Sequence, residues 1–341
     1  MIFFVLLGSS GCYLSTQAYH QIKLLRRQRS VVSMLQGPDL PEQLRHRLSF
    51  SQRVLAKAKL EGLDVGKAYT TYIDLEGRPV SYLVYAANPL AFKPITWWFP
   101  IVGEVRYLGF FDITDRDDKA QSFAAQGLDV YRGQASAFSS LGWFDDPLYS
   151  TMVRRSRMHI ASTLFHELTH RTIWLPGTAE FNEQLATFVE GLLTVQFLEE
   201  EGLVEDAARF HLYQQDYALY YKWQNSLRRE LKLVYEDYAA DKVNQGEALE
   251  LKKNILQRYT QQKVPLFKKY NFVGSSPWNN ARLLASSLYS PDTSKFQKAY
   301  ACRNWQNMGE FLTLLKDWAS KVDHPEDQLH NFCGGVASLT H

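Results

Sequence analysis

The sequence has little cysteine, almost no net charge and no long apolar run. Its 341 residues include only three cysteines, Cys12, Cys302 and Cys333, which are too few for a disulfide-dense scaffold and lack the paired spacing of a zinc ribbon. The net charge is +2, which gives no general field for capturing nucleic acid. We therefore expect no nucleic-acid partner, and any basic patch must be local.

The chain also lacks the composition of a disordered or repetitive protein. Apolar residues make up 45% and charged residues 22%, close to the averages of globular proteins. No internal repeat or low-complexity linker interrupts the chain, so residues 13–341 are predicted to form a single domain. Aromatic residues are numerous, with 8 Trp, 19 Tyr and 20 Phe, and they indicate a thick core, an aromatic-lined cleft, or both.

The amino terminus carries a short apolar stretch. Residues 1–12 form an apolar run that ends in small residues before Cys12, as in a bacterial lipoprotein signal. Cleavage there would leave a lipid-bearing cysteine, which predicts a protein anchored by lipid in the bacterial cell envelope and facing the periplasm. Two alternatives stay open: an uncleaved anchor over about residues 1–19, and a buried first helix of a cytosolic protein. The strongly apolar part falls well short of the roughly 18 residues that cross a bilayer.

The hydrophobic periodicity predicts an α+β fold, with a small mixed sheet in the N-terminal half and a mostly helical C-terminal half. Strand signals nearly vanish after Pro147. The predicted strands are residues 81–86, 97–102 and 128–131, and the predicted helices are residues 31–63, 115–126, 150–174, 178–200 and, as one or two helices of a long excursion, 203–260.

The most informative motif is His166-Glu167-Leu168-Thr169-His170, an HExxH pentapeptide within the predicted helix at 150–174. On a helix the two histidines lie within about 40° of each other, and the apolar residues around them fall on the opposite side. Two imidazoles one turn apart can bind a single Zn²⁺ at about 2.0–2.1 Å, with the glutamate beside them. The motif predicts one zinc ion per chain, with both histidines as ligands and Glu167 as the general base.

A third protein ligand is expected from the next helix, because a catalytic zinc normally has three. Glu183 lies on the polar face of the predicted helix at 178–200, and Ala186, one turn later, is small enough for the two helices to approach. Glu180 and Glu190 are rivals, but Glu190 lies about 10 Å beyond Glu183 along the axis, so the two cannot share one ion. We assign Glu183 as the ligand and leave Glu190 to orient a ligand or to bind substrate.

These residues resemble the gluzincin metallopeptidases, which pair HExxH on one helix with a glutamate motif on the next. Over nearly the whole chain, the sequence is more closely similar to a bacterial family of predicted lipoproteins described as aminopeptidases. The resemblance implies a zincin-like fold, a zinc cofactor, a peptide substrate and aminopeptidase activity. It is carried by Gly11-Cys12, Trp97 to Asp112, Gly127 to Tyr131, Ser139 to Pro147, His166 to His170, Phe181 to Glu190 and Asn279 to Leu283.

The resemblance also bears on the cysteines. Members of that family often have cysteines at two positions where this chain has Trp98 and Glu104, so a disulfide there is absent. In an oxidising compartment Cys302 and Cys333 could form a bridge if the geometry permits.

The predicted reaction is hydrolysis of a peptide bond by a water molecule that the metal holds and Glu167 activates. Tyr289 is a candidate for stabilising the oxyanion, and residues 135–143 are a candidate edge strand for pairing with the substrate backbone. An aminopeptidase must also hold a free ammonium close to the metal, which calls for a carboxylate. The candidates are Asp145, Asp146, Glu180 and Glu190.

Two other functions stay open at this point. A zinc endopeptidase would use the same chemistry on internal peptide bonds. A lipid-anchored binding or assembly protein with a structural zinc would instead present the helices at 203–260 to a partner. Glu167 argues against that second alternative, because a structural zinc site is closed by four protein ligands and has no use for a base.

Overall fold

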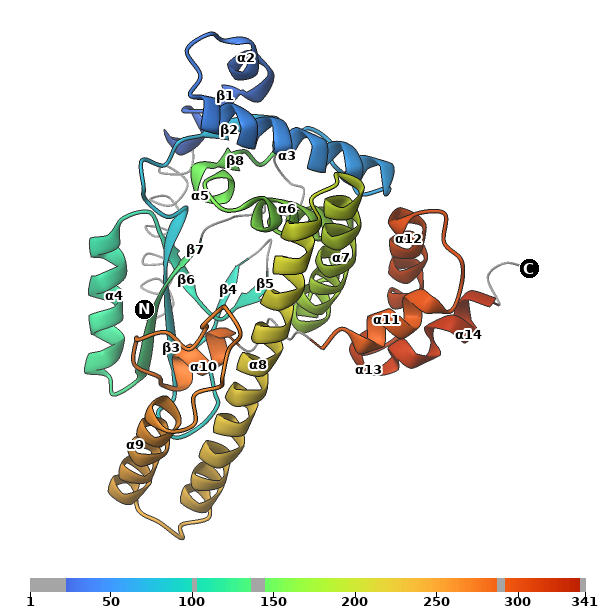
Figure 1. Ribbon diagram of the computed structural model, residues 1–341. Helices are drawn as coiled ribbons and strands as arrows, with labels where there is room; N and C mark the ends of the chain where they lie inside the picture. The colour runs from blue at the N-terminus through green and yellow to red at the C-terminus, as the bar shows by residue number, and fades with distance from the viewer. Residues whose placement is uncertain (1–22, 100–102, 136–144, 287–291, 338–341) are drawn as a thin grey trace, which may run out of the picture.

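The computed structural model describes residues 23–99, 103–135, 145–286 and 292–337, and it confirms the predicted α+β class (Figure 1). Within these ranges every strand comes before residue 150, and all later elements are helices. Cys12, Tyr289 and all but the first residue of the predicted substrate strand at 135–143 lie outside the described residues.

In the described residues the strands form three small sheets, of which one is mixed, and not the single mixed sheet that the sequence predicted. In the first sheet β1 pairs antiparallel with β2, and β2 pairs parallel with β8. In the second sheet β3 lies between β6 and β7 and is antiparallel to both. The third sheet is the antiparallel pair of β4 and β5. The strand bounds are β1 (Arg29–Ser30), β2 (Thr71–Ile73), β3 (Ser81–Ala87), β4 (Trp97–Phe99), β5 (Gly103–Val105), β6 (Leu108–Phe110), β7 (Asp129–Ala135) and β8 (Leu148–Tyr149). Strands of two or three residues carry too little pattern to specify their partners.

One face of the second sheet is packed and the other turns toward the helical half. Side chains of Val84, Ala86 and Phe110 form a core with Phe123 of α4 (Ile113–Ala125). Because side chains alternate along a strand, Tyr85 of β3 points to the opposite face.

The predicted helix at 150–174 is divided in the structure. Its first turn is α5 (Ser150–Val153), and the HExxH motif lies in a separate helix, α6 (Arg157–Thr172). The division falls before Ser156, whose backbone is extended at the N-cap of α6 and whose hydroxyl lies 2.7 Å from Nδ1 of His159. Serine is a common N-cap residue, although here its hydroxyl contacts His159 and caps no backbone N–H of α6.

Most of the other predicted helices are confirmed, although the stretch at 31–63 is two helices, α2 and α3, and the helices after residue 280 were not predicted. The predicted helix at 178–200 is α7, and the excursion at 203–260 is a hairpin of two helices, α8 and α9, which extends away from the sheets in Figure 1. The helix bounds are α2 (Val31–Gln36), α3 (Glu42–Leu60), α7 (Ala179–Glu200), α8 (Val204–Ala239), α9 (Gln245–Gln261), α10 (Asn280–Ser286), α11 (Ser294–Ala301), α12 (Met308–Ala319), α13 (Pro325–Gln328) and α14 (Phe332–Ala337).

The largest core lies where α3, α6, α7 and α12 meet. Phe50 of α3 packs against Phe197 of α7 with ring centroids 5.5 Å apart, and Lys57 forms a 2.7 Å ion pair with Glu200. On α6, Leu164 and its apolar neighbours are fully buried in this core; they are Ala161, Phe165 and Leu168. The apolar side of the HExxH helix therefore faces the core, as predicted.

A buried polar cluster joins the α8–α9 hairpin to the second sheet. The carboxylate of Asp129, at the start of β7, accepts bonds from the ammonium of Lys252 on α9 and from the backbone N–H of Asn280 on α10. The side chain of Asn280 donates to three carbonyl groups after β3 and accepts a 2.7 Å bond from the hydroxyl of Tyr235 on α8. Two of the sequence blocks that carry the family resemblance, 127–131 and 279–283, therefore meet in space.

A second buried carboxylate holds the segment after α9. Asp216 of α8 is fully buried and accepts hydrogen bonds of 2.7–2.9 Å from the backbone N–H groups of Lys268, Lys269 and Tyr270. Burial alone would raise the pKa of Asp216, but these three donors outweigh it and lower the pKa below its usual value. The charged carboxylate thus contributes stability above the pKa of an unfolded aspartate, and this contribution is lost as the pH falls through the lower, folded-state pKa.

We predict that Asp216→Asn lowers the free energy of unfolding by about 2 kcal/mol at pH 7, because an amide oxygen cannot replace the charged acceptor. The difference between variant and wild type should shrink when urea unfolding is measured below about pH 4. Asp237 is on the same helix as Asp216 and forms an exposed ion pair with Lys242, which follows the helix. Asp237→Asn is therefore the matched control and should change little. An equal loss at both pH values would contradict the role of charge at Asp216.

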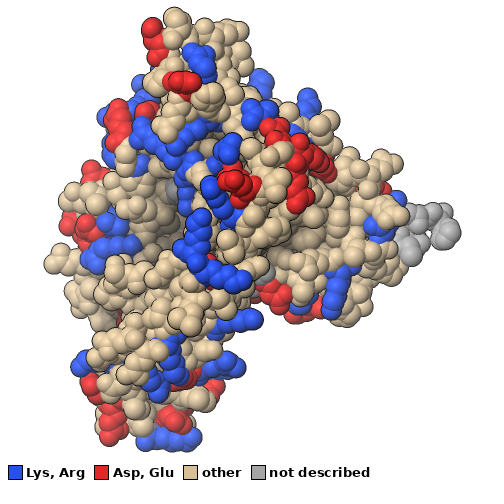
Figure 2. All heavy atoms as spheres, in the orientation of Figure 1, with Lys and Arg blue, Asp and Glu red and all other residues tan. Residues whose placement is uncertain are grey.

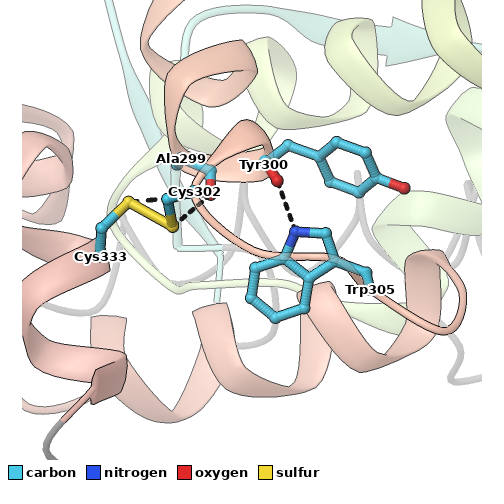
Figure 3. Close-up of a disulfide and its surroundings, with 5 residues drawn as sticks. All are labelled: Ala299, Tyr300, Cys302, Trp305 and Cys333. Carbon is cyan, nitrogen blue, oxygen red and sulfur yellow. Dashed lines mark hydrogen bonds between the residues drawn. A yellow bond between two sulfur atoms is a disulfide. The ribbon is translucent and has the colours of Figure 1, made fainter.

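The C-terminal helices α11 to α14 are joined by a disulfide between Cys302 and Cys333, whose Cα atoms are 6.0 Å apart (Figure 3). The structure confirms that the geometry permits this bridge. Beside it, the indole N–H of Trp305 donates a 2.5 Å bond to the carbonyl of Tyr300. The disulfide therefore closes the chain around α12 and fixes its two flanking segments to each other.

These C-terminal helices contact the rest of the protein through a close backbone approach. Gly62, after α3, has a left-handed φ of +78°, and a Cβ added at Gly309 would lie 2.6 Å from its carbonyl oxygen. The N–H of Gly309 also donates a 2.7 Å bond to the carbonyl of Glu61. Only glycine fits this contact on both sides.

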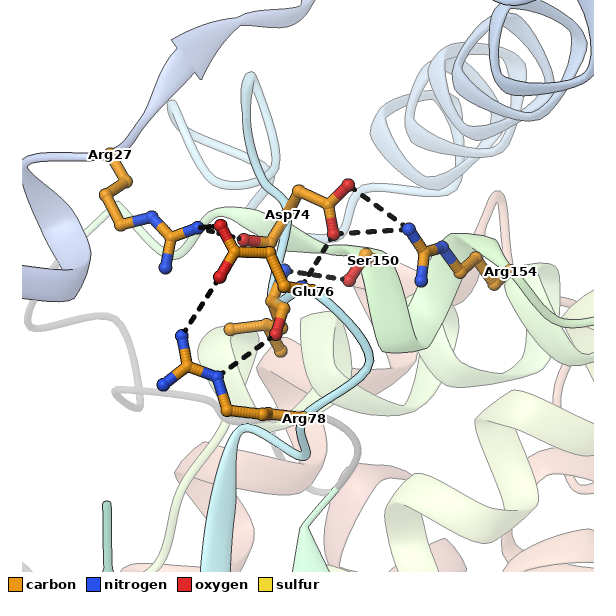
Figure 4. A network of polar contacts seen from close by, with 7 residues as sticks. Arg27, Asp74, Glu76, Arg78, Ser150 and Arg154 are labelled. Atoms are coloured by element: carbon orange, nitrogen blue, oxygen red, sulfur yellow. Dashed lines mark hydrogen bonds and ion pairs between the residues drawn. The ribbon is translucent and has the colours of Figure 1, made fainter. Parts of the chain in front are cut away.

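Surface charge is mixed, with a local concentration of basic groups. Figure 2 shows Lys and Arg side chains gathered over the middle of one face, with Asp and Glu among them. One ion network (Figure 4) links Arg27, Arg78 and Arg154 to Asp74 and Glu76 after β2, with bonds of 2.6 Å from Arg27 to Glu76 and 3.2 Å from Arg154 to Asp74. Exposed pairs of this kind contribute roughly 0–1 kcal/mol each, so the network mainly orients the N-terminal segment.

Two further observations concern the sequence expectations. Trp98 of β4 and Glu104 of β5 are direct cross-strand partners, so the two positions at which the resemblance implies cysteines in similar proteins face each other here. Among the helices in the described part of the chain, none is both long and apolar enough to cross a membrane.

Candidate metal centre

The short connection between α6 and α7 makes these helices pack along each other, and their facing polar sides bring three side chains together. His166 and His170, one turn apart on α6, lie with ring centroids 4.8 Å apart and rings nearly perpendicular. Glu183 of α7 lies opposite both. The three side chains are largely buried, with exposed fractions of 14%, 6% and 16%.

The potential ligand atoms of these residues converge on one point. The Nε2 atoms of His166 and His170 are 3.2 Å apart, and the Glu183 carboxylate oxygens lie 3.3 Å from the first and 3.5 Å from the second. Ligand atoms around a tetrahedral zinc ion are separated by roughly 3.3 Å. The geometry and the two-nitrogen, one-oxygen donor set therefore fit a metal ion, and these residues could hold one.

Glu190 supplies the contact that would orient a ligand. Its Oε2 lies 3.1 Å from Nδ1 of His166, about two helical turns beyond Glu183 on α7. After burial, Glu190 is also the main cause that raises the pKa of Tyr213 on α8 to about 12. The carboxylate thus lies between α7 and α8 on the far side of the imidazole, where a metal-binding histidine usually has a hydrogen-bond acceptor.

The charges of the centre perturb one another. Burial opposes the protonation of His166, but the contacts with Glu183 and Glu190 outweigh it and raise the pKa of His166 well above its usual value. Burial also disfavours the Glu183 carboxylate, yet the two histidines lower its pKa to about 2. Glu183 is therefore ionised at neutral pH, as a metal ligand must be.

Glu167 lies beside the three potential ligands without being one of them. Burial raises the pKa of its carboxyl group, and the two histidines offset part of this effect. Both Glu183 and Asp146 add smaller contributions that raise the pKa further. A carboxyl group next to a metal site, with a pKa shifted upward, is typical of a general base.

The structure separates the four carboxylates considered for binding a substrate amine. Glu180 is exposed and accepts a 3.1 Å bond from Gln184, and Glu190 is engaged with His166. Asp145 is exposed, 3.9 Å from the guanidinium of Arg171. Asp146 is buried, only 5% exposed, and its negative charge contributes to raising the pKa of Glu167. Of the four, Asp146 is the buried carboxylate that belongs to the surroundings of the proposed base.

Two residues near the centre carried no signal in the sequence. Tyr69 is buried and has a left-handed backbone with φ of 61°, an uncommon conformation for a non-glycine residue that costs about 1–3 kcal/mol. Its N–H donates a 2.6 Å bond to the carbonyl of Asp146, and burial together with the charge of Glu167 raises the pKa of its phenol. Arg171, next to His170, pairs with Asp64 at 3.4 Å. Tyr69 is a single tyrosine in a turn, with no repeating pattern around it, so the sequence alone could not identify it.

The chain was compared with models of known protein families. The model of a family described as "Putative aminopeptidase" matches residues 12–329. The chain belongs to this family. Comparison with curated proteins and with solved structures finds no match. The family assignment agrees with the resemblance seen in the sequence, and the matched range contains His166, His170, Glu183 and Glu167.

We predict that His166→Ala or His170→Ala abolishes stoichiometric zinc binding by the purified family member, because one of three protein ligands is lost. Glu190→Gln should retain zinc but weaken its affinity by about 10- to 100-fold, since the orienting carboxylate is removed. The measurement is zinc affinity by competition with a chromophoric chelator.

The matched control for this series is Glu180→Gln on the same helix, which should leave zinc affinity unchanged. Full zinc content in both histidine variants would rule out this centre as the metal site.

Proposed function

We propose that the protein is a zinc-dependent peptidase and acts as an aminopeptidase. The observation that carries the proposal is the convergence of three donor side chains, His166, His170 and Glu183, with Glu167 beside them. A set of three protein ligands with an adjacent carboxyl group is typical of a catalytic zinc site, whereas a structural site has four ligands. Membership of an aminopeptidase family supports a peptide as the substrate.

Each residue has a distinct part in the proposed reaction. His166 and His170 would hold the ion through Nε2, and Glu183 through a carboxylate oxygen. Bound zinc supplies a Lewis acid for the peptide carbonyl and for water. Glu190 keeps the Nδ1 proton of His166 in place, which leaves its Nε2 lone pair for the metal.

Glu167 moves the proton. Its carboxylate takes a proton from the attacking water and returns it to the nitrogen of the leaving amine. A base whose pKa is raised by burial performs both transfers better than an exposed glutamate, since its pKa lies closer to the working pH. This role requires the charged, unliganded carboxylate that the position beside the three donors provides.

We predict that Glu167→Gln retains zinc and the native fold but loses peptide hydrolysis by several orders of magnitude, because only the base is removed. Wild type and variant should be compared on free-amine peptides and on the same peptides with an acetylated N terminus. The aminopeptidase proposal expects cleavage of the free-amine series, and we propose Asp146, the buried carboxylate of the four candidates, as the group that binds the substrate ammonium.

The same assay contains its own controls. A Glu167→Gln protein that keeps most of its activity would make this residue a bystander. Preferential cleavage of the acetylated peptides would identify an endopeptidase and leave the zinc chemistry intact.

We also propose that the mature protein is anchored by lipid at Cys12 and faces the periplasm. The signal-like residues 1–12 and the beginning of the family match at Cys12 support this proposal. The disulfide between Cys302 and Cys333 supports an oxidising compartment, where such bonds persist.

We predict that the native protein begins at a Cys12 carrying lipid, and that Cys12→Ser abolishes both the processing and the lipid. Mass spectrometry of the N-terminal peptide from the membrane fraction measures both. An intact peptide from Met1 through Cys12 would contradict processing and favour the uncleaved anchor.

A further inference from the structure

The segment that follows α9 exposes apolar side chains between lysines. Residues 263–269 read Lys-Val-Pro-Leu-Phe-Lys-Lys and contain no acidic residue. Leu266 is 94% exposed and Val264 is 37% exposed, whereas Phe267 packs against the core of the α8–α9 hairpin. Single apolar residues on a protein surface are common, but a leucine that is almost fully exposed among lysines indicates a surface that another apolar phase covers.

Backbone hydrogen bonds hold this segment in one position. Asp216 of α8 accepts bonds from three consecutive backbone N–H groups, those of residues 268–270. The N–H of Phe267 donates a 3.1 Å bond to the carbonyl of Pro265. With the segment fixed at these points and the ring of Phe267 in the core, the side chain of Leu266 remains outside it.

A groove of about 550 Å³ opens beside this segment, between α8 and the end of α9. Its apolar lining includes Pro265, which directly precedes Leu266, and Leu219 of α8, which is 36% exposed. The exposed apolar residues after α9 therefore lie at the rim of a groove and are not isolated on a flat surface.

The polar lining of the groove is mainly basic. Lys222, Arg229 and Lys263 supply three positive charges, and Glu230 supplies one carboxylate. Glu230 is already neutralised, because it accepts a 2.7 Å bond from Lys263 and also pairs with Arg258. Among the ion pairs of the described residues, none includes Lys222 or Arg229. These two cations are exposed and are available to an anionic ligand.

We propose that this groove and the exposed Leu266 segment form a docking surface for a bilayer of anionic phospholipid. The phosphate of a lipid headgroup would pair with Lys222 and Arg229, and Leu266 would enter the boundary between headgroups and acyl chains. Apolar burial and attraction to anionic lipid both contribute to such binding. A soluble anion would satisfy the cations but would leave the exposed leucine unexplained.

This membrane contact is separate from the proposed peptidase chemistry, and it does not require lipid at Cys12. It would hold one side of the α8–α9 hairpin against the membrane surface. A lipid at the N terminus would bring the protein to the bilayer, whereas the groove would determine which face of the protein lies on it.

The test uses the full-length protein with the fluorophore NBD attached at Val264→Cys, which leaves Leu266 in place. Cys302 and Cys333 are bonded to each other, and protein without the new cysteine gives the background from Cys12. Vesicles contain phosphatidylcholine alone or equal parts of phosphatidylcholine and phosphatidylglycerol. With the mixed vesicles we expect NBD emission to shift to shorter wavelength and to be quenched by doxyl-labelled acyl chains, whereas neutral vesicles should give a much smaller effect.

Substitutions then separate the two parts of the surface. Leu266→Ser should lower the ratio of bilayer-embedded to water-exposed label by about 10-fold, because the largest exposed apolar group is lost. Lys222→Gln combined with Arg229→Gln should lower this ratio by about 25-fold, since each cation near an anionic surface contributes about 5-fold. Lys232→Gln is the matched control and should change little, because Lys232 pairs with Glu236 on α8 and does not line the groove.

A label at Leu60→Cys is the control for position, because Leu60 is 76% exposed and ends α3, which lies far from α9 in Figure 1. Equal shifts with neutral and anionic vesicles, or no effect of removing both cations, would overturn the proposal. A shift without vesicles would also overturn it. If that shift grows with protein concentration, a second copy of the chain covers the segment, and if inorganic phosphate induces it, the groove binds a soluble anion. None of these measurements depends on peptide hydrolysis.

Discussion

The close packing of α6 against α7 is the constraint on which the rest of the structure depends. It places one carboxylate, from Glu183, within 3.5 Å of two buried imidazole nitrogens. Taking such groups out of water is costly unless they are paired. The shifted pKa values of His166 and Glu183 show how strongly they stabilise each other's charged forms. A bound divalent metal would replace the positive charge of the histidines as the partner of Glu183. Its ligands would then be the neutral histidines and the ionised glutamate.

Two clusters of buried hydrogen bonds fix the elements that surround this helix pair. Asp129, Lys252 and Asn280 join the second sheet to the α8–α9 hairpin by buried hydrogen bonds, and Asp216 fixes the segment after α9 to α8. Half-satisfied buried groups would destabilise the fold, so these clusters define one arrangement of sheet and hairpin. In this arrangement Glu190 contacts Nδ1 of His166, and Glu183 contacts the other ring nitrogen, Nε2.

The blocks that carry the family resemblance are explained by these contacts. Residues 127–131 and 279–283 meet at Asp129 and Asn280, and the HExxH block meets residues 181–190 at the metal centre. Each pair of blocks is separated in sequence but forms one physical unit.

The sequence by itself determined the α+β class, the helical C-terminal half, the α8–α9 hairpin and the potential ligands His166, His170 and Glu183, because helical periodicity and the HExxH spacing are local properties of the chain. It did not determine the division of α5 from α6, the pairing of the short strands into three sheets, or which of four carboxylates lies near Glu167. Those features depend on contacts between residues far apart in the sequence. The left-handed Tyr69 beside Asp146 and the contact of Glu190 with His166 are likewise products of tertiary packing, since only packing decides which side chains of separate elements share one desolvated site.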